Sequence, residues 1–195
     1  MVAEARGRSA YDRETVLRTC VEVFNRRGYE ATSMGMLAKE LGISKAGIYH
    51  HVTSKEEILE VASDRALAGL EAARHRCESL EGTWSEKLAY LLRESVRLAI
   101  DDRPYVALLL RLRGNSPVEL AALERRRELT RFLEDLMVRA QEAGEIRDDV
   151  DARLQARLQL GMVNSVVEWF VSGGATGVGE LQDNVVQLVF RGIAA

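Results

Sequence analysis

Apolar residues recur along the chain with the spacing of helical faces. Residues 12–27 carry them at positions 16, 17, 20, 23 and 24, which form one face of a helix, and Gly28 follows where a left-handed residue can end it. No segment alternates as a strand does. Capping residues, glycine and proline bound the other long helices that the pattern predicts, which cover residues 54–79, 83–101, 105–113, 117–143, 151–172 and 180–193.

Two short helices are predicted between the first helix and residue 54. Thr32 or Ser33 can cap the first of them, which Gly42 ends about two turns later, and Ser44 caps the second. Two short helices joined by a tight turn that contains glycine are typical of a helix-turn-helix. The pattern therefore predicts an all-α protein of nine helices, with an N-terminal three-helix helix-turn-helix domain and a larger helical bundle after it.

Three helices are predicted to begin with a capping box. In Ser54-Lys-Glu-Glu57 the serine accepts a hydrogen bond from a free amide of the first turn, and Glu57 reaches back to the amide of Ser54. The same spacing recurs at residues 83–86 and 116–119, and in the last of these a proline takes the first helical position.

The composition is that of a globular protein, and charged residues are distributed unevenly along the chain. Of the 195 residues, 47% are hydrophobic and 29% are charged, and the formal net charge is −3. Residues 1–55 hold nine Lys and Arg against six Asp and Glu, whereas the remainder holds 18 against 24. The helix-turn-helix part is therefore the basic part, which is what contact with DNA phosphates requires.

Several classes of protein are excluded by the sequence. No stretch approaches the roughly 18 apolar residues of a membrane span, and residues 1–8 lack the apolar core of a signal peptide. We therefore expect a cytoplasmic protein without a membrane partner. Cys20 and Cys77 match neither a disulfide framework nor a zinc site, and the position of Cys20 on the apolar face of the first helix predicts a reduced core thiol.

Residues 32–55 contain a more specific pattern. A threonine opens the second helix, an apolar-Ala pair follows, Gly-apolar-Ser forms the turn, and a tyrosine and a lysine come after it; these are Thr32, Leu37-Ala38, Gly42-Ile43-Ser44, Tyr49 and Lys55. Together with the first helix, this pattern resembles the N-terminal domain of TetR-family transcriptional repressors over about residues 12–60. It departs from the family pattern at Val52, where an aromatic residue is usual, and at Gly35-Met36, where charged residues are common.

The resemblance implies contacts with double-stranded DNA around the turn. Ser44 caps the recognition helix, whose first turn then meets the major groove. Lys45 is the candidate for direct readout, with guanine O6 and N7 as its target, and the small residues Ala46 and Gly47 let the helix lie close to the bases. The residues expected to contact DNA phosphates are Thr32, Ser33, Tyr49, His50 and Lys55.

Other interpretations of this segment stay open. Tyr49 could be a packed core aromatic, although Ile48 already serves the core face. Adjacent side chains at positions 50 and 51 point about 100° apart on a helix, so we expect no metal site from these two histidines. Arg6 and Arg8 in the N-terminal arm could add contacts to phosphates or to the minor groove.

The larger part of the chain contains no catalytic constellation. His75 is the only histidine after residue 60, no Ser/His/Asp set is present, and the glycine-rich loop at 173–179 lacks the preceding strand and the lysine of a P-loop. We therefore expect neither an enzyme nor a cofactor.

The resemblance instead implies effector binding and homodimerisation for this part. The expected domains are residues 1–53 for the arm and the helix-turn-helix, and residues 54–195 for the ligand-binding and dimerisation domain. Wide apolar stripes over 151–172 and 180–193 suit a two-fold interface of four helices, although a folded core would explain the same stripes.

Candidate effector-binding residues are aromatic, flexible and isolated polar side chains of the predicted helices. Core packing explains each aromatic residue as well. The arginines at 111, 113 and 125–127 look like those of a branch of the family that senses acyl-CoA thioesters, since arginine suits phosphates, although a solvated face explains them too. The candidates are Trp84, Tyr105, Arg111, Arg113, Phe132, Met162, Asn164, Glu168 and Trp169.

These features predict a DNA-binding transcriptional repressor that a small molecule releases from a palindromic operator. The effector expected is hydrophobic, an acyl-CoA thioester being one candidate. Two alternatives stay open. One is a helical ligand-binding or enzymatic protein whose helix-turn-helix is only structural, and the other is a DNA-binding activator.

Overall fold

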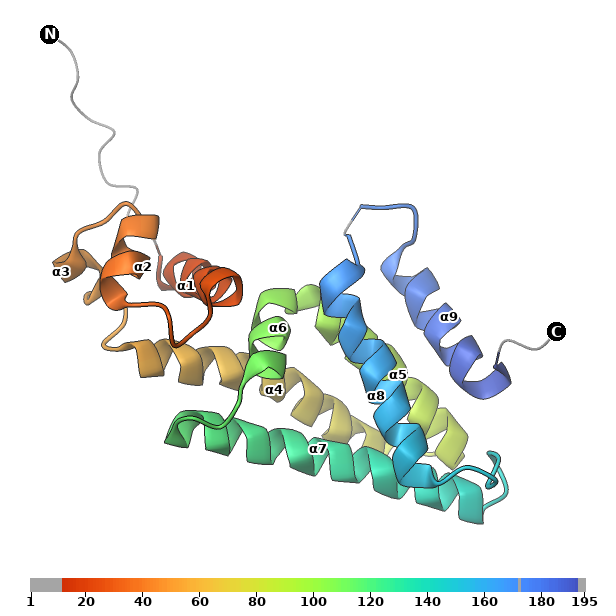
Figure 1. The fold of residues 1–195 in the computed structure, drawn as a ribbon. Helices are drawn as coiled ribbons and strands as arrows, with labels where there is room; N and C mark the ends of the chain where they lie inside the picture. The colour runs from red at the N-terminus through yellow and green to blue at the C-terminus, as the bar shows by residue number, and fades with distance from the viewer. Residues whose placement is uncertain (1–11, 172, 193–195) are drawn as a thin grey trace, which may run out of the picture. The chain divides into compact units, whose positions relative to one another are not determined.

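The computed structural model describes residues 12–171 and 173–192, and these form nine helices and no strand (Figure 1). The expected all-α fold is confirmed. Arg6 and Arg8 lie outside the described residues. No described helix combines the length and the apolar character that crossing a membrane requires. The helices are α1 (Arg13–Arg27), α2 (Met34–Glu40), α3 (Lys45–Ile48), α4 (Lys55–Ser79), α5 (Trp84–Asp101), α6 (Arg103–Arg111), α7 (Pro117–Glu142), α8 (Ala152–Trp169) and α9 (Val178–Arg191).

The chain divides into two compact units within α4, between Ala62 and Ser63. In the first unit, α1, α2, α3 and the start of α4 enclose a small core of apolar side chains. The free thiol of Cys20 is buried in this core, which confirms the expectation from its position on the apolar face. The largest fully buried side chains of this unit are Phe24, Leu37, Ile48, Ile58 and Leu59.

The helix α3 is shorter than the apolar pattern predicts. The helical spacing of Ile48 and Val52 predicts a helix that continues to Val52, but α3 ends at Ile48. The amides of His50 and His51 donate to carbonyls only three residues back, those of Gly47 and Ile48, with N–O distances of 3.3 and 3.0 Å. Such bonds tighten the chain beyond the geometry of an α-helix, so α3 has a single α-helical turn.

In the second unit α5 lies at the centre and packs against α6, α7, α8 and α9. Gly69 of α4 lies so close to α5 that a Cβ at this position would be 2.5 Å from Leu98 Cδ2, which explains the glycine. Cys77 is a free, fully buried thiol in an apolar cluster of the second unit. Other members of the cluster are Ala73, Leu88, Leu91, Leu133, Leu136, Met137, Ala140, Ala152 and Ala156.

The predicted capping boxes form in different ways. The box at residues 83–86 is confirmed, because the side chain of each partner bonds the backbone of the other. At the start of α4 only half of the box is present. Ser54 Oγ accepts from the amide of Glu57 at 3.1 Å, but the carboxylate of Glu57 bonds the amide of Thr53 and not that of Ser54.

The turn between α6 and α7 is organised by a buried carboxylate. Ser116 Oγ caps α7 as predicted and accepts from the amide of Glu119 at 3.2 Å. The side chain of Glu119 is only 3% exposed, and it reaches past Ser116 to earlier amides. Its Oε2 accepts hydrogen bonds at 2.8, 2.8 and 3.3 Å from the amides of Arg113, Gly114 and Asn115.

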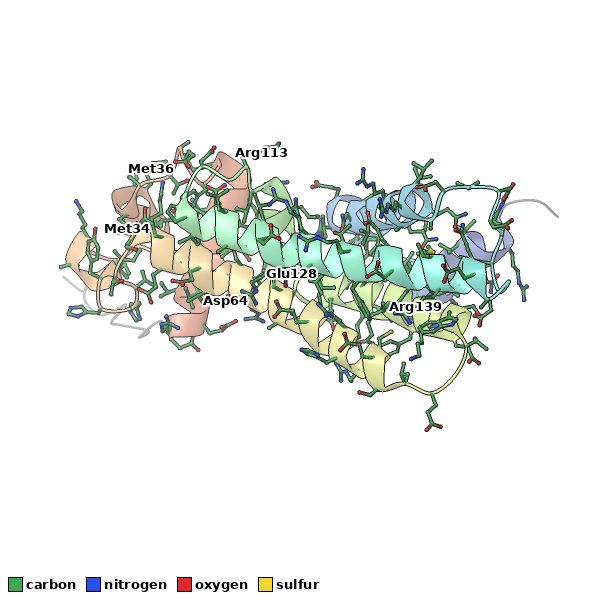
Figure 2. All side chains as sticks on the ribbon, turned by 90° about the horizontal axis from the view of Figure 1, so that it is seen from below. Met34, Met36, Asp64, Arg113, Glu128 and Arg139 are labelled. Carbon is green, nitrogen blue, oxygen red and sulfur yellow. The ribbon has the colours of Figure 1, made fainter. Side chains whose placement is uncertain are left out.

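Replacing Glu119 by glutamine is expected to destabilise the protein. The amide keeps one acceptor oxygen but loses the charge that strengthens three hydrogen bonds, so we expect Glu119→Gln to lower the free energy of unfolding by about 1–3 kcal/mol. Urea unfolding followed by circular dichroism measures this change. Glu128→Gln on the exposed side of α7 is the matched control (Figure 2) and should change stability by less than about 0.5 kcal/mol. Equal losses in the two variants would contradict the role of Glu119.

Candidate DNA-binding site and effector cavity

The turn and helix α3 expose most of the residues expected to contact DNA. Ser44 Oγ accepts from the amide of Gly47 at 2.9 Å and so caps the helix, while Ile48 is fully buried and fixes its inner face. A Cβ on residue 47 would lie 3.2 Å from Ser44 Oγ, so the glycine also makes room for the cap. The exposed residues, which we call the α3 surface, are Lys45, Ala46, Tyr49 and His50.

Tyr49 does not belong to the core. Its side chain is 45% exposed, whereas Val52, the next apolar residue of the segment, is buried. The phenol group is therefore available to a partner, as are the exposed side chains of Lys45 and His50 in the same segment.

The start of α2 offers one accessible hydroxyl. Ser33 is exposed, and its Oγ accepts from the amide of Met36 at 3.3 Å, which leaves the hydroxyl hydrogen free to donate. Thr32 is only 2% exposed. Its hydroxyl donates to the carbonyl of Gly28 at 2.7 Å and its amide to the carbonyl of Tyr29 at 3.2 Å, so both of its donors are bonded inside the fold.

Lys55, the first residue of α4, is held by Tyr29. Its Nζ donates to the carbonyl of Tyr29 at 3.0 Å and lies 4.3 Å from the centroid of the Tyr29 ring, which in turn packs edge-on against Phe24. An ammonium group has three N–H donors, and this arrangement uses one of them. The charge of Lys55 is therefore fixed in place with two donors left for a phosphate.

A network that the sequence did not reveal joins both ends of the first unit. Arg13 Nη2 of α1 donates to Glu57 Oε1 at 2.8 Å, and its Nε donates to the carbonyl of His51 at 3.3 Å. The amide and hydroxyl of Thr53 donate to Glu57 Oε2 at 2.5 and 2.7 Å. These bonds from Thr53, followed by that from Arg13, lower the pKa of Glu57 to about 2. The segment that follows α3 is thereby tied to α1 and to α4.

The second unit contains a cavity of about 420 Å³ between α4, α5, α6, α7 and α8. Most of its wall is apolar and comes from leucine side chains. Two of the nine candidate ligand residues, Phe132 and Asn164, line it. Arg126, one of the three consecutive arginines considered in the sequence analysis, also lines it, whereas sequence reasoning missed the polar wall residues Arg74, Ser95 and Thr130.

Other candidate residues have partners elsewhere in the second unit. Tyr105 is buried with the guanidinium of Arg65 at 4.3 Å from its ring centroid, and Arg111 pairs with Glu168 at 3.3 Å. Trp84 packs against Arg139, whose guanidinium lies 5.0 Å from the ring centroid. The remaining candidates, none of which lines the cavity, are Arg113, Met162 and Trp169.

Large apolar side chains are exposed on α8 and α9. Leu158 is 64% exposed, and nothing lies within 4 Å of a Cβ placed on the neighbouring Gly161. A surface of this kind usually marks an interaction site. The exposed apolar residues on these two helices are Leu154, Leu158, Trp169, Leu188 and Phe190.

The exposed helix α3 and the helical unit with an apolar cavity define a class of protein that joins a helix-turn-helix domain to a helical domain able to enclose a small molecule. Comparison with known families agrees with both parts. The model of the bacterial regulatory proteins of the tetR family matches residues 16–62, and that of the tetracyclin repressor-like C-terminal domain matches residues 81–193. The chain belongs to the TetR family of transcriptional regulators.

Individual relatives are similar to this chain over most of their length. SCO3833, a TetR-family member from Streptomyces coelicolor A3, is 45% identical, with 98% of this chain and 97% of that chain covered and a TM-score of 0.87. AibR, crystallised with isovaleryl coenzyme A and operator DNA, is 26% identical over 91% of this chain and 97% of its own, with a TM-score of 0.77. The transcriptional regulator UidR of Escherichia coli K12 is 29% identical over 163 residues, which are 80% of this chain and 79% of UidR.

Removal of the Glu57 charge is expected to cost stability in a pH-dependent way. A lowered pKa in the folded state stabilises the fold at pH values above the ordinary glutamate pKa of 4.5, and this contribution disappears as the pH falls toward 2. We expect Glu57→Gln to lower the free energy of unfolding at pH 7 by about 1–2 kcal/mol, and the difference from wild type to shrink between about pH 5 and pH 2. Urea titrations at several pH values measure it.

The adjacent exposed residue provides the control for this prediction. Glu56→Gln removes a carboxylate of the same helical turn and should leave the stability unchanged to within about 0.5 kcal/mol at every pH. A Glu57→Gln deficit that stayed constant down to pH 2 would show that the charge of Glu57 does not stabilise the fold.

Proposed function

We propose that this protein is a homodimeric repressor that binds a palindromic DNA operator through the α3 surface and leaves it when an effector occupies the cavity. Its DNA-binding domain covers residues 1–53 and its ligand-binding and dimerisation domain covers residues 54–195. The protein acts in the cytoplasm and catalyses no reaction. The observation that carries the proposal is the α3 surface itself, where polar side chains project outward from a turn whose inner side is anchored by buried Ile48.

The DNA contacts divide into two groups. Lys45 lies in the first turn of α3 and reads bases in the major groove, with Ala46 and Gly47 allowing close approach. Contacts to phosphates position the protein without reading sequence. The residues proposed for them are Ser33, Tyr49, His50 and Lys55, whose exposed or fixed polar groups support the assignment.

The helix α4 provides the connection between effector and DNA. It begins at Lys55, next to the network of Glu57, and the same helix supplies Leu70, Ala73 and Arg74 to the cavity wall. A ligand that displaces α4 changes the separation of the two recognition helices in a dimer. Half-sites one helical turn of DNA apart require a separation of roughly 34–36 Å, so a shift of a few ångströms weakens specific binding. The AibR structure, which holds isovaleryl coenzyme A and operator DNA, supports an effector-responsive regulator with this architecture.

The effector proposed is a small molecule with an apolar body. The leucine-rich wall of the cavity supports this choice. An acyl-CoA thioester is one candidate because AibR binds one. The arginines expected to hold its phosphates have acidic partners here, since Arg111 pairs with Glu168 and Arg125 with Asp64 and Glu71.

Dimerisation through residues 151–172 and 180–193 is supported by the exposed apolar residues of α8 and α9. α9 packs against α5, and α8 packs against α5, α6 and α7, but Leu158 of α8 and Leu188 of α9 remain exposed and available to a second copy. A two-fold dimer of this kind presents two recognition helices to a palindrome.

A binding assay tests the proposal directly. Fluorescence anisotropy or a mobility shift with DNA from upstream of the protein's own gene should show sequence-selective binding at moderate salt that weakens steeply as salt increases. Binding of equal strength to random DNA of the same length, or none at all, would leave the helix-turn-helix with a structural role only. A thermal-shift screen with acyl-CoAs, fatty acids and aromatic compounds, followed by operator release, tests the effector.

Two lysine variants should affect DNA binding differently. Lys45→Ala removes a base contact, so we expect it to weaken operator binding by about 1–3 kcal/mol with little change for random DNA. Lys55→Ala removes a phosphate contact and should weaken both, with the salt slope reduced by about one. Arg76→Ala, an exposed change on α4 in the second unit, is the control for loss of positive charge. An equal loss on operator and random DNA from Lys45→Ala would contradict its role in readout.

A charge placed on α8 should separate the dimer. Leu158→Glu puts a carboxylate at the most exposed of the large apolar residues of α8 and α9, so we expect a monomer by analytical ultracentrifugation at micromolar concentration and operator affinity reduced at least tenfold. Leu120→Glu on α7 makes the same change at a residue that is also exposed and should leave the protein dimeric. A dimeric Leu158→Glu variant would place the interface elsewhere.

A further inference from the structure

The cavity wall carries positive charge without a matching negative one. Its lining consists of apolar residues, a few neutral polar residues and two arginines, Arg74 from α4 and Arg126 from α7, and it contains no aspartate or glutamate. The two guanidinium groups differ in their surroundings, and this difference indicates the kind of molecule that the cavity takes.

The charge of Arg74 is already balanced. Its Nε donates to Glu78 Oε1 at 3.1 Å, one turn further along α4, and its guanidinium lies 5.0 Å from the centroid of the Phe132 ring. The wall therefore gains little net charge from this residue.

Arg126 has no acidic partner among the residues that the structure describes. Its Nη1 donates to the carbonyl of Leu109 at 3.1 Å, which is a neutral acceptor at the end of α6. Burial and, to a smaller extent, the charge of Arg127 lower the pKa of Arg126. Its two neighbours on α7 are different, because Arg125 pairs with Glu71 at 2.8 Å and Arg127 with Glu124 at 3.0 Å.

A half-buried cation that donates only to a neutral carbonyl lowers the stability of the protein unless a ligand supplies the opposite charge. A guanidinium has five N–H donors in a planar fork, which matches the two oxygens of a carboxylate. We propose that the cavity binds a small carboxylic acid in its ionised form, with the carboxylate at Arg126 and an apolar chain along the leucine-rich wall. This proposal rests on the proposed function only in taking the cavity as the effector site.

The volume of the cavity limits the length of the chain. A dry protein cavity of about 150 Å³ holds one benzene molecule with its six carbons, so about 420 Å³ corresponds to roughly 17 non-hydrogen atoms. A straight-chain acid such as decanoate fits this limit. Coenzyme A is larger than the cavity, so an acyl-CoA would place only its acyl chain inside, and its thioester carbonyl brings no charge to Arg126.

Calorimetric titration of the DNA-free protein tests the proposal with three matched probes. Decanoate carries the carboxylate, methyl decanoate has the same chain without the charge, and decanoyl-CoA carries its charges on the nucleotide part. We expect decanoate to bind at least tenfold more tightly than both. In Arg126→Met, which keeps the length of the side chain, the preference for the acid over the ester should disappear. In Arg127→Met, which removes the adjacent exposed arginine, the preference should remain.

Several results would overturn the proposal. These are equal binding of acid and ester by the wild-type protein, tighter binding of decanoyl-CoA that depends on Arg126, or a preference for the acid that survives in Arg126→Met. If Arg126→Met fails to fold, the wild-type comparison of acid and ester still decides the question, together with Arg126→Lys. The lysine keeps the charge but not the planar fork, so this variant should bind decanoate more weakly than wild type. Operator binding measured without ligand is a separate result. If the protein binds its operator but no acid, this inference alone is rejected. If it binds the acid but no operator, only the repressor function is rejected.

Discussion

A helix of four residues cannot maintain its own shape, and the first unit is arranged around this constraint. Forming one helical turn fixes several backbone angles for a single hydrogen bond, so α3 depends on contacts from outside it. Ile48 anchors its inner face in the core and Ser44 closes its start. Beyond its end, the carboxylate of Glu57 holds Thr53 while Arg13 holds the carbonyl of His51. The exposed side chains of this turn are therefore presented from a fixed backbone, as selective recognition of base edges requires.

The features of the fold that could be predicted from the sequence are those with local causes. Apolar spacing, a glycine after a helix and a serine or threonine before one each act within about one turn, and they located all nine described helices. The capping box at 83–86 is of this kind. Predictions failed where a side chain bonds a partner outside its own turn. Glu119 was predicted to bond the amide of Ser116, but its carboxylate bonds the amides of residues 113–115. The end of α3 at Ile48 was also not predicted, and there the amides of His50 and His51 form tight local bonds just before the buried Val52.

The cavity proposed as the effector site was predicted less well because a residue type does not reveal its partner. Tyr105 and Trp84 were plausible ligand contacts, but each lies against an arginine from another helix. The three consecutive arginines of α7 look identical in the sequence. Successive residues of a helix point about 100° apart, so the outer two meet carboxylates of α4 and of α7 itself, while the middle one reaches the cavity wall. The chemistry of this site therefore follows from the way helices pack.

The two cysteines have a consequence for how each part of the molecule can be observed. Cys20 lies in the core of the first unit and Cys77 in that of the second, both fully buried as free thiols. Burial raises the pKa of Cys20 to about 12 and also raises that of Cys77, so neither forms the reactive thiolate while its unit is closed. Each unit therefore contains one thiol that becomes reactive only when the unit opens. The rate of alkylation at each cysteine then reports separately how often the first and the second unit unfold.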